Sequence, residues 1–145
     1  MIPQFKKLTD QEQELLYRAP VLISVLASCS EKEINKAKKK DAIKLAHLKT
    51  FTADPLLIPY YTEVEKNFGT QFEAAEKQYC PFDENKRNEL SNEIEHVNQI
   101  IAKLDPFYGR VLSRSFKKYE NHVRRANHSV FQDFIIPLQI PGLND

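Results

Sequence analysis

Six basic residues in the last third of the chain have the spacing of a single helix face. They are Arg110, Arg114, Lys117, Lys118, Arg124 and Arg125. At about 100° per residue these positions fall within roughly a third of the circumference of a helix, and only Glu120 opposes them in charge. Cations gathered in this way can bind phosphates or carboxylates. We therefore expect this face to bind an acidic protein partner or an anionic ligand.

The competing interpretation is a solvated helix face that a neighbouring acidic helix partly neutralises. The acidic helix would carry Glu84, Glu89, Glu93 and Glu95. A second dense group of cations comprises Lys36, Lys38, Lys39, Lys40, Lys44 and Lys49. Because the chain has 21 Lys and Arg against 20 Asp and Glu, and the basic face has no interleaved aromatic residues or glycine-rich loops, nucleic acid is not the expected partner.

One stretch has a pattern that metal ions use. Glu89, Glu93 and His96 stand at i, i+4 and i+7 on a predicted helix, and the last two form a Glu-x-x-His pair of the kind found in di-metal helical bundles. A second such pair is missing. The other histidines, His47, His122 and His128, follow Lys44, Tyr119 and Arg125 by three positions. A metal-dependent helical enzyme or sensor is thus the alternative function, although the same spacing also suits a row of ion pairs with the basic helix.

No other pattern indicates catalysis. The chain has no Gly-x-Ser-x-Gly turn and no glycine-rich phosphate loop, and neither cysteine has a histidine nearby in sequence. We assign no catalytic residue and expect no cofactor beyond the alternative divalent metal.

The segment Leu26-Ala27-Ser28-Cys29 has the form of a lipoprotein cleavage box behind an apolar run. This alternative, a surface lipoprotein processed at Cys29, requires a basic leader. Residues 1–18 instead mix acidic with basic residues and contain a helix-capping pattern, which indicates a folded helix. We therefore expect a short buried helix here and a cytoplasmic protein whose two cysteines, Cys29 and Cys80, are reduced.

The next residues, "SEKEINKAK" from 30 to 38, resemble the loop of TerB-type domains, a helical family named for tellurite resistance. In that family an apolar helix ends in an A-D-G-x-I-D-x-x-E loop, where the next helix begins. Ile34 holds the anchor position, and Glu31 and Asn35 stand where the two aspartates would be. The resemblance, over residues 21–48, implies a helical fold and a metal-binding role in a stress response, with Glu31 and Asn35 as candidate ligands.

Two departures from that pattern alter the implied site. Lys32 replaces the glycine and Lys38 replaces the glutamate. A hard cation needs several converging oxygen ligands, and a lysine among them repels it. If the fold is TerB-like, its metal site is therefore expected to be lost.

Helix start signals divide the rest of the chain. Capping patterns stand at Thr9, Ser30, Asp54-Pro55, Asp83 and Asp105-Pro106. Pro20 is expected to end the first helix and start another over 21–27, and a short turn at Pro55 is expected before a helix over 60–79. Apolar stripes of helical period follow: Val64, Phe68, Phe72, Ala75, Tyr79; Leu90, Ile94, Val97, Ile101, Leu104; and Tyr108, Val111, Leu112, Phe116, Tyr119, Val123.

The 145 residues therefore predict an all-α fold in one compact domain, with about six helices in an orthogonal or bundle-like array. Hydrophobic residues make up 41% and charged ones 28%, as in ordinary globular proteins. The tail over 129–145 is apolar but carries Pro137 and Pro141, so we expect an extended strap packed on the domain. The longest apolar run is too short to span a membrane.

Overall fold

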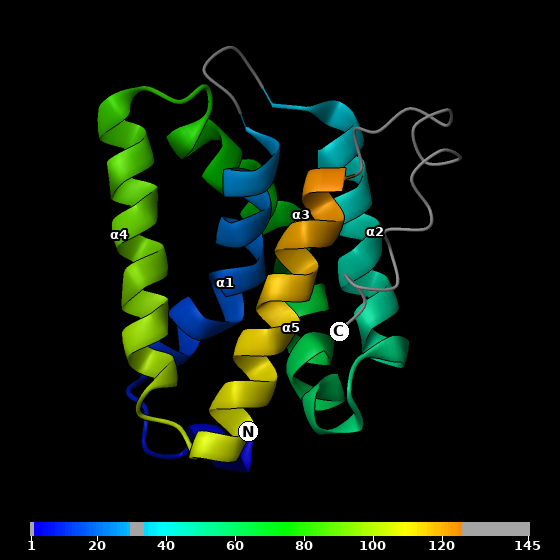
Figure 1. Ribbon diagram of the computed structural model, residues 1–145, viewed down its shortest axis with the longest axis vertical. Coiled ribbons are helices and arrows are strands. Elements are labelled where there is room, and N and C mark those ends of the chain that lie inside the picture. The colour runs from blue at the N-terminus through cyan, green and yellow to red at the C-terminus, as the bar shows by residue number, and fades with distance from the viewer. Residues whose placement is uncertain (1, 30–33, 126–145) are drawn as a thin grey trace.

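The computed structural model of the chain describes residues 2–29 and 34–125 (Figure 1). Within these residues it is all-α, as predicted, with five α-helices, two single-turn 3-10 helices and no strand. The elements are η1 (Pro3–Phe5), α1 (Asp10–Ser28), α2 (Lys36–Thr52), η2 (Pro55–Leu57), α3 (Ile58–Tyr79), α4 (Glu84–Ile101) and α5 (Pro106–Arg125). The predicted strap over 129–145 lies outside the described residues.

Helix α1 is the centre of the fold, because it packs against each of the other four α-helices. Figure 1 shows α4 at the left of α1, α2 at the right, and α5 crossing in front. Most of α1 from Leu15 to Ser28 is buried. Helix α4 packs mainly on α1 and touches α3 and α5 at few positions. This leaves room for a hollow on either side of α4.

The predicted break at Pro20 is wrong, since α1 continues through it. Proline has no N–H, so the carbonyl of Leu16, four residues earlier, loses its donor within the helix. The buried hydroxyl of Tyr60 on α3 donates a hydrogen bond of 2.6 Å to that carbonyl. A tertiary contact thus replaces the missing hydrogen bond and keeps the helix whole.

The corner after α1 also differs from the prediction. Helix α1 ends at Ser28 with Cys29 as its C-cap, close to the predicted end near Cys29, but α2 begins at Lys36 and not at Ser30. The backbone N–H of Asn35 donates to the carbonyl of Ser28 at 2.7 Å, and Ile34 forms an antiparallel bridge with Cys29. The Asn35 side chain then accepts from the N–H of Lys38 and caps the helix. Residues 30–33 lie outside the described part of the chain.

The remaining start signals are confirmed. Thr9 and Glu12 form the reciprocal capping box, and Asp54, Asp83 and Asp105 each accept a backbone N–H at the start of η2, α4 and α5. In the three predicted stripes all positions are buried except Ile94 and Val111, which are half-buried. Local patterns therefore located most helices correctly.

The expectation of reduced thiols is wrong, because Cys29 and Cys80 form a disulfide. The bond joins the C-terminal end of α1 to the C-terminal end of α3. The two cysteines are 51 residues apart in sequence, so nothing in their spacing indicated the pairing. None of the described helices is both long enough and apolar enough to cross a membrane.

Candidate functional site

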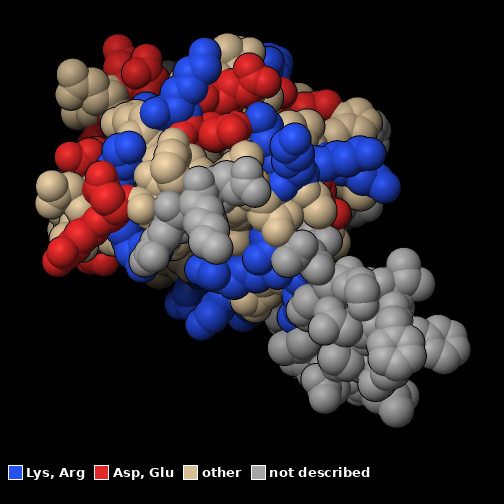
Figure 2. Space-filling view, turned by 90° about the horizontal axis from the view of Figure 1, so that it is seen from above, with Lys and Arg blue, Asp and Glu red and all other residues tan. Residues whose placement is uncertain are grey.

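The six predicted basic residues all lie on α5, on the side away from the core. Arg110, Arg114, Lys117 and Arg124 are exposed, and Lys118 and Arg125 are half-buried. In the view from above, Lys and Arg side chains gather at the lower edge and at the right, whereas Asp and Glu gather at the left and the top (Figure 2). The nearly neutral chain therefore has an uneven surface charge.

Within the described residues, no acidic residue of α4 forms an ion pair with this face. The only α4 carboxylate with an ion pair among the described residues belongs to Glu93, and its partner is Arg18 on α1 at 3.5 Å. On α5 itself, Arg124 donates to Glu120 at 3.1 and 2.8 Å. The other five cations have no carboxylate partner within residues 2–29 and 34–125. The predicted row of ion pairs between α4 and α5 is absent there.

The packing of α2 against α5 brings a cation of each helix together. Lys49 of α2 is half-buried, and its Nζ lies 5.8 Å from the centre of the Tyr61 ring. Burial lowers the pKa of Lys49, and the nearby charge of Lys118 lowers it further. In contrast, Lys39 pairs with Glu76 at 2.7 Å. At Lys49 and Lys118, an incoming anion would relieve repulsion between like charges.

A groove runs between α4 and α5, along the edge of the basic face that borders α4. Its lower hollow, of about 480 Å³, is lined by Ile101, Ala102, Leu104, Pro106, Gly109, Arg110, Ser113 and Arg114. Its upper hollow, of about 320 Å³, is lined by Ala19, Ile23, Ile94, Val97, Asn98, Ser113, Phe116, Lys117 and Glu120. Ser113 lines both hollows, so they are neighbours along α5. Three of the six predicted basic residues, Arg110, Arg114 and Lys117, stand along this groove.

Gly109 sets how closely α5 approaches the end of α4. A Cβ atom at this position would lie 3.3 Å from the carbonyl oxygen of Ile101 and 3.4 Å from its Cγ2. Such contacts are tighter than most, so the absence of a side chain allows the close packing. The lower hollow forms directly beside this contact.

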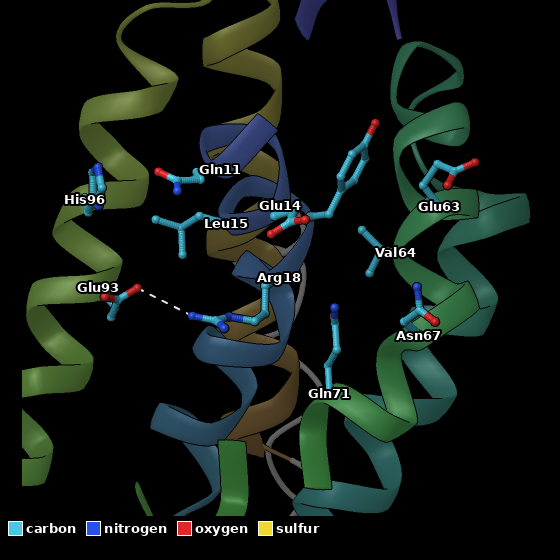
Figure 3. Close-up of a pocket in the computed structure, with 11 residues that line it drawn as sticks. Gln11, Glu14, Leu15, Arg18, Glu63, Val64, Asn67, Gln71, Glu93 and His96 are labelled. Atoms are coloured by element: carbon cyan, nitrogen blue, oxygen red, sulfur yellow. Dashed lines mark ion pairs between the residues drawn. The ribbon is translucent and has the colours of Figure 1, made fainter. Parts of the chain in front are cut away.

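A second, more polar pocket of about 620 Å³ lies on the opposite side of α4, across α1 and α3 (Figure 3). Its lining residues are Gln11, Glu14, Leu15, Tyr17, Arg18, Glu63, Val64, Asn67, Gln71, Glu93 and His96. Glu93 points from α4 toward Arg18 on α1. The Nε atom of Arg18 is buried and has no hydrogen-bond partner among the described residues.

This polar pocket mixes three carboxylates, one guanidinium, one imidazole and several amides. None of its lining residues is a serine, threonine or cysteine. It therefore offers hydrogen bonds and charges to a ligand but no hydroxyl or thiol of the kind used in acyl transfer, apart from the phenol of Tyr17. Burial raises the pKa of Tyr17, and the charge of Glu63 raises it further, which opposes ionisation of that phenol.

The candidate metal ligands are not brought together. Glu93 and His96 line the polar pocket, but Glu89 does not. The side-chain oxygen of Asn35 caps α2, and Glu31 lies outside the described residues. Among residues 2–29 and 34–125, no three His, Cys, Asp or Glu side chains gather in a way that could hold a metal ion.

The lipoprotein interpretation gains no support from the structure. Ala27 and Ser28 are buried in the last turn of α1, and the sulfur of Cys29 is bonded to Cys80. Cleavage before Cys29 would remove the central helix, and the sulfur that would carry the lipid is already in a disulfide.

Sequence reasoning missed the groove floor and most of the polar pocket. The floor residues Ile94, Ile101 and Leu104 were predicted as core, and they are indeed buried or half-buried. Only the shallow contact between α4 and α5 leaves space beside them. In the polar pocket, Gln11 comes from α1 and both Asn67 and Gln71 come from α3, so no local signal connects the residues of the two helices.

Comparison with models of protein families, with curated proteins and with solved structures gives no match for this chain. Function must therefore be argued from the geometry of the chain itself.

Proposed function

We propose that this chain is a helical binding protein whose α5 basic face holds an acidic protein partner. The observation that supports the proposal is that five of the six cations on this face have no carboxylate partner within the described residues. Unpaired cations on one face attract and orient an oppositely charged surface.

The length of the face favours a protein over a small anion. From Arg110 to Arg125 the helix rises about 22 Å, at 1.5 Å per residue. A small anion would touch one or two of these side chains, whereas a protein surface can engage most of them. The half-buried pair Lys49 and Lys118 adds a point at which a carboxylate of the partner would relieve repulsion.

The proposal also concerns the cellular compartment in which the chain meets its partner. The sequence predicts a cytoplasmic protein, and that location stays a prediction. Disulfides persist in oxidising compartments and are rare in the cytosol. The Cys29–Cys80 bond therefore argues against the predicted cytoplasmic location and supports a partner encountered in an oxidising compartment.

The metal-dependent alternative, including a TerB-like stress-response role, stays a prediction that no specific contact favours. Glu93 is engaged by Arg18 and Asn35 by a helix N-terminus, so two of its five candidate ligands already have other partners. Elemental analysis of protein purified from its own source would test it.

The test of partner binding is charge reversal on the basic face. The wild-type chain should retain an acidic protein from an extract of the organism that makes it. The double substitution Arg114→Glu with Lys118→Glu should lower the retained amount at least tenfold, because attraction becomes repulsion. Quantitative mass spectrometry of the retained proteins measures this change.

The matched control reverses two other cations, Lys7→Glu with Lys77→Glu. Both residues are exposed and make no ion pair with another described residue, and the control has the same net charge as the test variant. It should retain the partner. Equal retention by the test variant and the wild type, retention of nucleic acid in place of protein, or no specific retention at all would each contradict the proposal.

A further inference from the structure

The groove between α4 and α5 differs from the rest of the basic face because its floor is apolar. Ile101 and Leu104 form the floor of the lower hollow, and Ile94, Val97 and Phe116 contribute to that of the upper one. A charged face alone does not need such a floor.

The α5 edge of the groove is mainly basic, and the α4 edge is neutral. The α5 edge carries the cations of Arg110, Arg114 and Lys117. At its upper end Glu120 accepts a hydrogen bond from Arg124. On the α4 edge the lining residues are the neutral Asn98 and Ala102. An occupant that matches this pattern is apolar where it enters the groove and acidic along the side that meets α5.

The spacing of the hollows fits a helix. On α5 the lower hollow is centred near Arg110 and the upper one near Phe116 or Lys117. At 1.5 Å per residue they are about 10 Å apart. Two side chains seven residues apart on an α-helix are separated by about the same distance, and amphipathic helices commonly enter grooves with anchors at this spacing.

We infer that the α4–α5 groove binds an amphipathic acidic helix of the partner, with apolar anchors seven residues apart in the two hollows and carboxylates on Arg110, Arg114 and Lys117. The inference rests on the proposed function, since it names the part of the partner that the basic face holds. A nucleic acid backbone or an anionic membrane surface would use the cations but would not place two apolar anchors in the hollows.

The test uses two synthetic peptides of equal composition and charge. In one, leucines at positions i, i+3 and i+7 of a glutamate- and alanine-rich helix form a single stripe; in the other, the same residues are scrambled. Fluorescence anisotropy with the full chain should show at least tenfold tighter binding of the striped peptide. Duplex RNA and phosphatidylserine vesicles, measured in the same buffer, should bind more weakly than the striped peptide.

Two variants separate the groove from the charged face. Ser113→Trp fills the groove at the junction of the hollows, and Ala102→Trp fills the lower hollow from α4; both positions are exposed, and both variants keep every charge. Each should weaken the striped peptide at least tenfold, and Ser113→Ala should not. Thermal unfolding confirms that each variant is folded.

The outcomes distinguish the two proposals. If the striped peptide binds both tryptophan variants as tightly as the wild type but loses affinity for Arg110→Glu with Arg114→Glu, the groove is overturned and the basic face stands. Equal affinity for the striped and scrambled peptides also overturns the groove. If RNA or vesicles bind more tightly than either peptide, both proposals fail.

Discussion

At the scale of single residues, the hydroxyl of Tyr60 decides the shape of the central helix. Its hydrogen bond to the Leu16 carbonyl takes the place of the one that Pro20 cannot donate. Both ends of this contact are fully buried, so water cannot substitute for the lost donor. A buried carbonyl without a partner carries its full desolvation cost.

Removing that hydroxyl is therefore expected to destabilise the chain. Tyr60→Phe should lower the free energy of unfolding by about 1–3 kcal/mol, measured by urea denaturation. Tyr17→Phe, which removes a phenol that hydrogen-bonds no described residue, serves as the control and should change it by less. In a Pro20→Ala background residue 20 can donate to Leu16, so the cost of Tyr60→Phe should shrink. An equal cost in both backgrounds would show that the hydroxyl has another role.

At the scale of elements, the disulfide holds the C-terminal ends of α1 and α3 together. Cys29 follows the last turn of α1, and Cys80 follows the last turn of α3. A bond between positions 51 residues apart restricts the unfolded chain, which is the main source of its stabilising effect in the chain-entropy account.

Replacing both cysteines, Cys29→Ser with Cys80→Ser, should lower the free energy of unfolding by about 4 kcal/mol according to the loop-entropy relation. Urea denaturation of the variant measures the loss, and the wild type in excess reductant should show a similar one. Titration of thiols in the unfolded, unreduced protein should find none. Two reactive thiols per chain would contradict the disulfide.

At the scale of the whole molecule, buried tyrosines link stability to pH. Burial raises the pKa of Tyr60, Tyr61, Tyr108 and Tyr119 above the usual 10. The folded state therefore keeps these protons at pH values where the unfolded chain loses them. Their contribution to stability is complete below pH 10 and is lost as the pH rises above it.

Below pH 10 these tyrosines are protonated in both states, so they should not change the free energy of unfolding with pH. Above pH 10 the free energy of unfolding should fall steeply. Each tyrosine that stays protonated only in the folded state contributes a slope of about 1.4 kcal/mol per pH unit. Lys49, with its lowered pKa, acts in the opposite direction but is a single group. Urea midpoints at pH 8, 9, 10 and 11 measure the profile. A midpoint at pH 11 equal to that at pH 9 would show that the phenols ionise without unfolding.

The sequence alone determined the helical class, most helix starts and the basic face of α5. These depend on contacts within a few residues: Asp83 caps α4 through the N–H of Lys86, and the stripe from Tyr108 to Val123 follows from the helical period. The local period also placed the six cations on one side. Each of these features can be worked out without knowing what lies across the core.

Only the tertiary structure decided the continuity of α1, the disulfide, the groove and the polar pocket. Pro20 predicts a helix break, but α1 continues because the hydroxyl of Tyr60 on α3 supplies the missing hydrogen-bond donor. Cys29 and Cys80 can pair only because the fold brings the C-terminal ends of α1 and α3 together. The groove exists because α4 rests on α1 and leaves α5 partly uncovered, a matter of how helices distant in the chain pack together. Such contacts depend on the relative placement of whole helices, which no local sequence pattern specifies.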